Sequence, residues 1–249
     1  MDLKGRLALV TGGGVRVGRA ISLALAAKGA RLAVHYRASR AEAESAAAEI
    51  RKAGGEAVLL QADLSRMEDV ERLASEAERA AGGVDVLVNS ASAFFRTPVE
   101  AITEADWDAL LDGNLKGPFF LARRLGLAMR ARGRGKIVNI TDWAAERPYP
   151  SYLPYCISKA GLAAAPKGLA RALAPSVQVN AVAPGPILPP PGMSESERAE
   201  VASGTLLGRW GSPSDIAAAV AFLCESDYIT GETLTIDGGR SLAGPAGTS

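Results

Sequence analysis

Residues 7–18 read LALVTGGGVRVG. The uninterrupted apolar residues that open this stretch predict a short parallel strand that is buried on both faces. After the glycines, Ile21 and Leu25 recur with helical spacing before Lys28 and Gly29 end the pattern. A strand, a glycine turn and a helix in this order are typical of dinucleotide binding, because glycines let the backbone approach a pyrophosphate and the helix N-terminus attracts its charge. A tight turn that binds no ligand is the alternative.

Strand-like and helix-like stretches alternate along the rest of the chain. Further strands are predicted over residues 31–36, 57–61, 84–88, 136–140, 177–182 and 233–236, and helices over about 39–53, 67–81, 104–131, 194–203 and 213–224. This alternation predicts an α/β fold, a doubly wound, Rossmann-like parallel sheet with helices on both faces. We expect one domain over 1–249, with a substrate lid at about 186–210, where a Pro-rich loop has little regular structure.

Composition narrows the classes of partner. The chain has 28 Lys and Arg against 27 Asp and Glu, interspersed rather than in blocks, so we expect no nucleic-acid or membrane partner and a small molecule instead. Cys156 and Cys224 are far apart and His35 is the single histidine, so no metal site is expected. The N-terminus has no signal-peptide core and no run approaches the ~18 apolar residues of a membrane span, which predicts a cytoplasmic protein.

The residues that follow the second predicted strand indicate which dinucleotide is bound. Folds that prefer NAD place a carboxylate there for the ribose 2′-OH, whereas this chain has Tyr36-Arg37-Ala38-Ser39-Arg40. Together with Arg16 in the glycine turn, this segment offers guanidinium and hydroxyl groups to a 2′-phosphate. We therefore predict NADPH rather than NADH. The alternative is that Arg37 and Arg40 are ordinary solvated residues at the start of a helix.

Polar and aromatic side chains follow the third and fourth predicted strands. Asp63 is placed either to accept a hydrogen bond from the adenine amino group or to cap the next helix. Phe94 and Phe95 lie just past a strand end, where ligands bind in parallel sheets, so one of them either stacks on a flat ring or packs into the core. Asn114 lies on an otherwise apolar helix face, and a buried amide there needs backbone partners or a proton-relay water.

Tyr155 and Lys159 form a candidate acid/base pair. Because they are four residues apart on a predicted helix, they lie one turn from each other, and a neighbouring ammonium lowers the pKa of a phenol by favouring the phenolate. The fifth predicted strand delivers Thr141 and Asp142 to the same edge of the sheet, which places Asp142 beside this helix. The alternative is that Asp142 turns away and Tyr155 acts with Thr141.

The whole chain resembles the short-chain dehydrogenase/reductase family. The resemblance is carried by Thr11-Gly12 with Gly18, Asn89, Asn114, Tyr155 with Lys159, Pro184-Gly185 and residues 230–239, TGETLTIDGG. It implies binding of NAD(P)(H), hydride transfer from the nicotinamide, Tyr155 as the acid/base, and Lys159 holding the ribose and lowering the pKa of the tyrosine. It also implies a homotetramer, because most members of the family are tetrameric.

Two departures from the usual pattern of the family resemble the pteridine reductase subgroup. Arg16 stands where most members have a glycine, and Asp142 stands where most have a serine, thirteen residues before the tyrosine. This resemblance implies that Phe94 sandwiches a pterin against the nicotinamide, that Ser92 and Arg16 contact cofactor and pterin, and that Asp142 with Tyr155 handles protons. Ser90 replaces the usual second asparagine after the fourth strand, and Ala38 stands where pteridine reductases carry an arginine, so the 2′-phosphate contact shifts to Arg37.

The resulting hypothesis is an NADPH-dependent reductase that takes a dihydropterin or dihydrofolate to the tetrahydro form. An ionised carboxylate only accepts hydrogen bonds, so Asp142 suits a substrate rich in N–H donors. The predicted catalytic residues are Asn114, Asp142, Tyr155 and Lys159. The predicted cofactor site comprises Gly12, Arg16, Val17, Tyr36, Arg37, Ser39, Asp63, Leu64, Asn89, Ala91, Lys159, Pro184 and Gly185. The predicted substrate site comprises Arg16, Ser92, Phe94, Asp142 and Tyr155.

Two rival functions remain open. A carbonyl reductase of 3-oxoacyl thioesters or sugars shares every feature except the meaning of Arg16, Phe94 and Asp142. A cofactor-sensing binding protein without chemistry is the rival from a different class, and the intact pair of Tyr155 and Lys159 argues against it.

Overall fold

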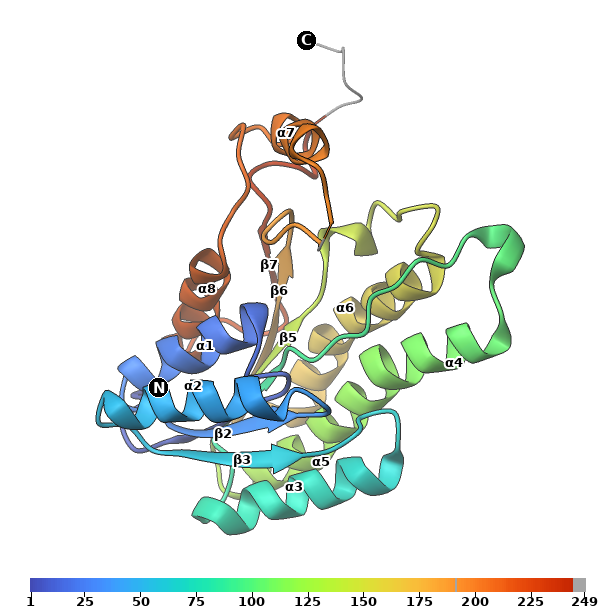
Figure 1. Cartoon of the computed structure of the whole chain (residues 1–249). Coiled ribbons are helices and arrows are strands. Elements are labelled where there is room, and N and C mark those ends of the chain that lie inside the picture. Colours follow the sequence, from blue (N-terminus) through green and yellow to red (C-terminus); the bar gives the residue numbers. More distant parts are fainter. Residues whose placement is uncertain (191, 244–249) are drawn as a thin grey trace.

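A computed structural model describes residues 1–190 and 192–243 of the protein, and its centre is a sheet of seven parallel strands (Figure 1). The strands are β1 (Leu7–Val10), β2 (Arg31–Tyr36), β3 (Ala57–Gln61), β4 (Val86–Asn89), β5 (Gly135–Ile140), β6 (Val177–Pro184) and β7 (Thr233–Ile236). They are arranged in the order β3-β2-β1-β4-β5-β6-β7. The predicted α/β fold with a doubly wound parallel sheet is therefore confirmed.

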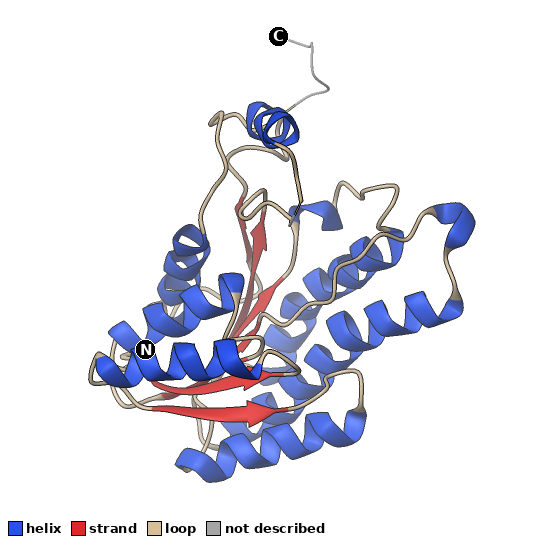
Figure 2. Ribbon diagram, viewed as in Figure 1, coloured by secondary structure: helices blue, strands red, loops and turns tan. Residues whose placement is uncertain are grey.

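Helices cover both faces of the sheet (Figure 2). One face carries α1 (Arg16–Ala27), α2 (Arg40–Lys52) and α8 (Pro213–Glu225), and the other carries α3 (Met67–Ala81), α4 (Glu104–Leu111), α5 (Gly117–Ala131) and α6 (Leu153–Leu173). Successive strand residues point to opposite faces, so Val10 packs into the core on the α1 side and Leu9 into the core on the α3 side. The short helix α7 (Glu195–Ser203) lies beyond the carboxyl edge of the sheet.

The helix predicted over 104–131 differs most from expectation. It comprises α4, a π-helical segment over Asp112–Lys116, and α5. Asn114 lies in the widened turn, where its side chain is completely buried. Gly117 follows it, and a Cβ there would come within 2.0 Å of the Leu64 carbonyl oxygen. Close packing against this carbonyl explains why residue 117 is a glycine. The predicted bounds of the other helices and strands agree with the observed ones to within two residues.

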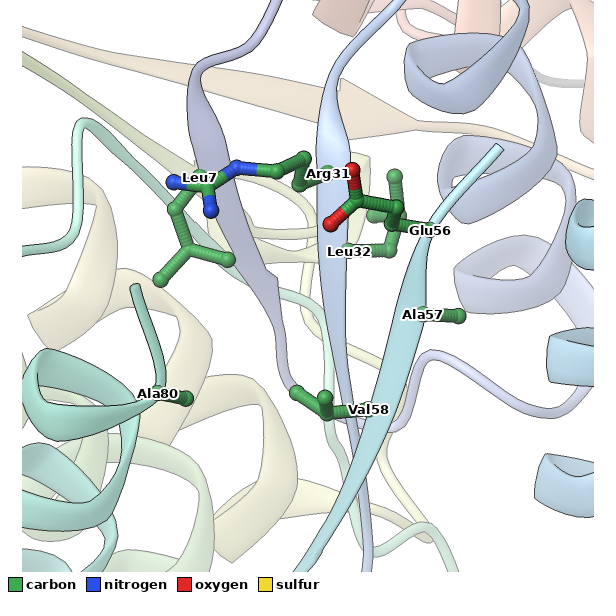
Figure 3. A pocket seen from close by; sticks show the side chains of 7 residues that line it. All are labelled: Leu7, Arg31, Leu32, Glu56, Ala57, Val58 and Ala80. Carbon is green, nitrogen blue, oxygen red and sulfur yellow. The ribbon is translucent and has the colours of Figure 1, made fainter. Parts of the chain in front are cut away.

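The strand order fixes where a ligand binds. β1 has β2 on one side and β4 on the other, so the connections that leave the carboxyl ends of β1 and β4 diverge and open a crevice there. At the opposite edge, a small cavity of about 30 Å³ is bordered by Leu7, Arg31, Leu32, Glu56, Ala57, Val58 and Ala80 (Figure 3). A cavity of this volume is too small for a dinucleotide.

Among the residues that the structure describes, no helix combines the length and apolarity needed to cross a bilayer.

The glycine turn yields a test of the close packing around α1. A Cβ added at Gly18 would lie 2.1 Å from the carbonyl oxygen of Gly12, so the backbone of the turn would have to shift. We expect Gly18→Ala to lower the free energy of unfolding by about 1–3 kcal/mol, as measured by denaturant titration. Gly168→Ala in α6 is the matched control, because a Cβ there meets nothing within 4 Å. The control should leave stability unchanged or raise it by up to about 1 kcal/mol, and equal stabilities of the two variants would contradict the packing argument.

Candidate active site

Asp142 and Tyr155 are joined by a short hydrogen bond at the carboxyl edge of the sheet. Asp142 follows β5, Tyr155 lies in the first turn of α6, and the Tyr155 Oη donates to Asp142 Oδ2 at 2.6 Å. The other oxygen, Asp142 Oδ1, accepts from the Ala144 N–H at 2.8 Å. Thr141 is 3% exposed and its hydroxyl donates to the Val182 carbonyl. The alternative in which Asp142 turns away and Tyr155 acts with Thr141 is therefore wrong.

The electrostatics of this pair are set by burial and by the carboxylate. Burial raises the pKa of Tyr155, and the charge and hydrogen bond of Asp142 raise it further. Burial also raises the pKa of Asp142, although the hydrogen bonds from Tyr155 and Ala144 and the charge of Lys159 oppose that shift. The net effect keeps the phenol protonated at neutral pH.

Lys159 lies one helical turn after Tyr155 in α6 and is almost completely buried. Its Nζ donates to the Ile140 carbonyl at 3.0 Å and lies 5.8 Å from the centre of the Tyr155 ring. Burial lowers its pKa to about 8, so it carries a proton at neutral pH. The lowered tyrosine pKa expected from the lysine is not found, because burial and Asp142 dominate at the phenol.

Asn114 is satisfied by backbone partners. Its Oδ1 accepts from the Ala93 N–H at 2.7 Å, and its Nδ2 donates to the Ala93 carbonyl at 2.9 Å. Both bonds fix the segment after β4 that carries Ser92 and Phe94. Of the two options for this amide, the backbone one is observed, and the π-helical turn that presents Asn114 is a feature often found at functional sites.

Phe94 offers a flat apolar surface next to the tyrosine. Its side chain is 49% exposed, stacks on Tyr152 with ring centres 4.5 Å apart and planes 2° apart, and meets Tyr155 edge-on at 4.7 Å. Phe95 is 37% exposed, so core packing is wrong for both phenylalanines. Tyr152 was not among the predicted site residues, although it lies only three residues before Tyr155, at the N-cap of α6.

The glycine turn holds β1 and β4 together. Gly12 has φ +63°, and a Cβ there would lie 3.0 Å from the Cα of Ala91. The Thr11 hydroxyl oxygen accepts from the N–H groups of Ser90 and Ala91 at 2.9 and 3.0 Å. Beyond the turn, a hollow of about 490 Å³ is lined by Gly14, Val15, Arg16, Arg19, Ala41, Glu42 and Ser45.

Arg16 adopts a backbone conformation that is unfavourable for residues other than glycine. Its φ is +48°, and it is the only non-glycine residue with a positive φ among residues 1–190 and 192–243. Left-handed backbone costs an L-residue about 1–2 kcal/mol, and such strain concentrates at functional sites. The guanidinium of Arg16 donates to the Leu188 carbonyl at 3.3 Å and so connects the glycine turn with the predicted lid.

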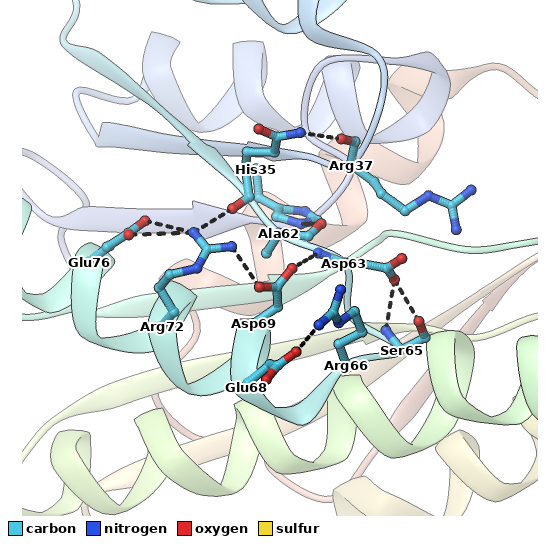
Figure 4. A network of polar contacts seen from close by, with 11 residues as sticks. His35, Arg37, Ala62, Asp63, Ser65, Arg66, Glu68, Asp69, Arg72 and Glu76 are labelled. Atoms are coloured by element: carbon cyan, nitrogen blue, oxygen red, sulfur yellow. Dashed lines mark hydrogen bonds and ion pairs between the residues drawn. The ribbon is translucent and has the colours of Figure 1, made fainter.

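The ends of β2 and β3 carry the groups expected at the adenosine end. Arg40 pairs with Glu44 at 2.8 Å within α2 and fits the interpretation as a helix-entry residue, whereas Arg37 is exposed and precedes the helix. Asp63 Oδ1 accepts from the N–H and hydroxyl of Ser65, so Asp63 closes a turn and does not cap α3, whose N-cap is Arg66. Figure 4 shows Arg37 and Asp63 pointing to the same side.

The charge of Asp63 is stabilised in this position. Burial opposes its ionisation, but the hydrogen bonds from Ser65 and the charge of Arg37 outweigh burial and lower the pKa of the carboxyl.

The predicted site residues collect at one edge of the sheet. Following the strands in chain order, they are Gly12, Arg16 and Val17; Tyr36, Arg37 and Ser39; Asp63 and Leu64; Asn89, Ala91, Ser92 and Phe94; Asp142; and Pro184 and Gly185. Asn114 joins them from the π-helical segment, and Tyr155 and Lys159 join them from α6.

Three of these residues use their side chains elsewhere. Asn89 Nδ2 donates to Asn139 Oδ1 and to the Pro118 carbonyl, and the side chains of Tyr36 and Leu64 pack into the core. Only their backbones are left to border the crevice.

Comparison with known proteins identifies the family. The family model described as Enoyl-(Acyl carrier protein) reductase matches residues 14–241. A 3-oxoacyl-[acyl-carrier-protein] reductase of Synechocystis sp. is 36% identical over 245 residues, which cover 96% of this chain and 98% of the relative. The chain belongs to the short-chain dehydrogenase/reductase family.

Two solved structures of short-chain dehydrogenase/reductase proteins match the whole fold. FolM alternative dihydrofolate reductase 1 from Brucella canis, complexed with NADP, is similar with a TM-score of 0.92 and 35% identity, covering 99% of each chain. The angucycline C-6 ketoreductase LanV with bound NADP is similar with a TM-score of 0.90 and 32% identity, covering 97% of each chain. The resemblance inferred from the sequence is thus confirmed at the level of the family.

The backbone strain at Arg16 of this short-chain dehydrogenase/reductase is testable. We expect Arg16→Gly to raise the free energy of unfolding by about 0.5–1 kcal/mol, because glycine adopts a positive φ without steric cost. Arg16→Ala is the control, since it removes the same guanidinium but keeps the strain. Denaturant titration of both variants checks this expectation, and equal stability of the two would show that the strain is not released.

The raised pKa of Tyr155 is a second expectation for this member of the family. Asp142→Asn removes the negative charge that disfavours the phenolate, so the pKa of Tyr155 should fall and tyrosinate should form at lower pH. The measurement is a pH titration of tyrosinate absorbance, in which the signal missing from Tyr155→Phe belongs to Tyr155. An unchanged midpoint in Asp142→Asn would mean that the carboxylate does not control this phenol.

Proposed function

We propose that the protein is an NADPH-dependent pteridine reductase that takes a dihydropterin, dihydrofolate included, to the tetrahydro form. The observation that carries this proposal is the hydrogen bond from Tyr155 to the Asp142 carboxylate, because a partly buried acceptor stands where a carbonyl reductase needs a donor. The strained Arg16 and the half-exposed Phe94 border the same site and support the proposal.

The cofactor end of the site fits NADPH. No carboxylate follows β2, and the exposed guanidinium of Arg37 with the hydroxyl of Ser39 would hold the 2′-phosphate. Gly12 has a positive φ and packs against Ala91 in the turn where the pyrophosphate would bind. The NADP bound by two similar structures agrees with this choice. Lys159 would hold the ribose, and the cofactor supplies the hydride when it is bound.

The proton chemistry follows from the paired side chains. An aminopterin presents N–H and NH₂ donors, which an ionised carboxylate such as Asp142 accepts. Reduction of a C=N bond adds a hydride to carbon and a proton to the neighbouring nitrogen. Tyr155 keeps its proton at neutral pH because burial and Asp142 raise its pKa, so the phenol can supply that proton. The protonated Lys159 nearby stabilises the phenolate left behind.

The substrate end of the site fits a planar ring. The exposed face of Phe94 lies beside Tyr155, and Asn114 fixes the backbone at Ala93, so the aromatic surface is held in place. We infer that Phe94 stacks on the pterin and that Ser92 and Arg16 contact it at its edge.

A carbonyl reductase is the second candidate. The relative from Synechocystis sp. is named a 3-oxoacyl-[acyl-carrier-protein] reductase. For such a reaction Asp142 would have to be protonated in order to donate to the developing oxyanion, and burial does raise its pKa in that direction.

We also propose a lid and an assembly. The lid comprises residues 186–210, of which Pro191 lies outside the described residues, and its Leu188 carbonyl is held by Arg16. A homotetramer, as the family resemblance implies, would bury the exposed apolar side chains of Trp107 on α4 and of Phe119 and Leu127 on α5.

Substrate choice is tested by NADPH oxidation with dihydrobiopterin or dihydrofolate against acetoacetyl thioesters and simple diketones. We expect turnover of the pterins. Asp142→Ser should lower pterin turnover by about 100-fold, because a positioned proton-transfer partner is lost, and should leave or improve ketone turnover, because a hydroxyl can donate to the oxyanion.

Two outcomes would contradict the proposal. Turnover of the carbonyls alone would leave the fold and cofactor intact and establish the second candidate. Tyr155→Phe should abolish turnover while NADPH still binds, and unchanged turnover in that variant would remove Tyr155 from the mechanism.

A further inference from the structure

The single histidine of the chain lies buried between two turns of the cofactor site. His35 is 1% exposed and is the penultimate residue of β2. The Gly12 N–H donates to its Nδ1 at 3.1 Å, and its Nε2 lies 3.1 Å from the Ala62 carbonyl oxygen. Because Nδ1 accepts, Nε2 carries the proton and donates to Ala62. Figure 4 shows the ring lying against Ala62.

The two turns are distant in sequence and serve different parts of a dinucleotide. Gly12 belongs to the turn that would receive the pyrophosphate, and the His35 carbonyl also accepts from the Gly13 N–H at 3.0 Å. Ala62 immediately precedes Asp63, which is placed to receive the adenine. The His35 side chain therefore connects the pyrophosphate turn directly with the adenine turn.

The protonation state of the ring is fixed. Burial lowers the pKa of His35 to about 4, although the Ala62 hydrogen bond and the charges of Asp63 and Asp69 oppose that shift. A second proton on Nδ1 would face the Gly12 N–H and break that hydrogen bond. At neutral pH the histidine thus holds one tautomer and one set of partners.

We propose that His35 is a positioning residue that sets the spacing of the pyrophosphate turn and the adenine turn, with one ring nitrogen responsible for each. This inference rests on the proposed cofactor NADPH, and it does not depend on whether the substrate is a pterin or a carbonyl compound. Its consequence is that the two hydrogen bonds affect different ends of the bound dinucleotide.

Two substitutions separate the two bonds. In His35→Asn the amide oxygen replaces Nδ1, so the Gly12 bond is kept and the Ala62 bond is lost. In His35→Gln the amide nitrogen replaces Nε2, so the Ala62 bond is kept and the acceptor for Gly12 is lost. The probes are NADPH and adenosine 2′-monophosphate, which has the adenine end but no pyrophosphate.

The expected result is that the two substitutions affect the two ends of the dinucleotide differently. His35→Asn should weaken binding of both probes by about tenfold, whereas His35→Gln should weaken NADPH by about tenfold and leave adenosine 2′-monophosphate within about twofold. The kcat at saturating NADPH should stay at the wild-type value in both variants, because neither bond reaches the reacting atoms.

Asn180 provides a control for the loss of a buried side chain that bonds to the backbone. Its Nδ2 donates to the Ile229 carbonyl at 2.9 Å and its Oδ1 accepts from the Glu232 N–H at 3.1 Å, so both bonds go to the single segment that precedes β7. Asn180→Leu should lower the unfolding temperature without changing the affinity for either probe.

Other outcomes overturn the inference. If both His35 variants lost affinity for both probes equally, in proportion to a fall in unfolding temperature, His35 would be a core residue only. If both variants kept wild-type affinities, His35 would have no role in positioning the two turns. Wild-type protein that does not bind NADPH would overturn the proposed cofactor and this inference with it.

If either variant does not fold, nitrogen NMR of the wild-type ring decides, since one histidine gives one unambiguous pair of signals. We expect the Nε2–H tautomer, with Nε2 shifted by adenosine 2′-monophosphate and Nδ1 shifted by inorganic pyrophosphate. Another tautomer or unshifted signals would refute the proposal.

Discussion

The hydrogen bond between the Tyr155 phenol and the Asp142 carboxylate is the interaction on which the proposed chemistry of this protein depends. It requires that the end of β5 and the first turn of α6 lie side by side, which the parallel sheet provides. It also requires a cation nearby, because two acidic groups are buried together. Lys159 supplies that charge from below, held by the Ile140 carbonyl. The strand end, the helix and the buried lysine thus form one unit, and the hydrogen-bonded pair requires all three of them.

The same unit explains why related proteins can differ in substrate while sharing a fold. A carboxylate in place of a hydroxyl reverses the direction of one hydrogen bond, because the first accepts and the second also donates. The rest of the sheet edge is indifferent to that change. Under the proposed function, the glycine turn and the nicotinamide site would serve either chemistry. Specificity would then rest on three side chains: Asp142 for protons, Phe94 for the ring and Arg16 for the edge of the substrate.

Much of this arrangement could be predicted from the sequence, because hydrophobic periodicity locates strands and the ends of parallel strands meet at one edge. That rule predicts from the sequence alone that Asp142 lies beside Tyr155. Other features depend on contacts that sequence spacing does not encode. The π-helical turn at Asn114 accompanies its two bonds to Ala93, and the stacking of Phe94 on Tyr152 brings together distant segments. The role proposed for His35 depends on a tautomer set by Gly12 and Ala62.

The π-helical segment between α4 and α5 has a consequence for the phase of the long helix. One extra residue in a turn rotates everything that follows by about 100° relative to a regular α-helix. The apolar side of α4 therefore packs against α6, while α5 turns its own toward α3 and the sheet. The long helix therefore consists of two halves with different rotational phase that meet at Asn114, and Asn114 bonds to the backbone of Ala93 in the segment after β4. An insertion or deletion of one residue between Glu104 and Ala131 would act as a rotation of one half against the other, not as a local change of length.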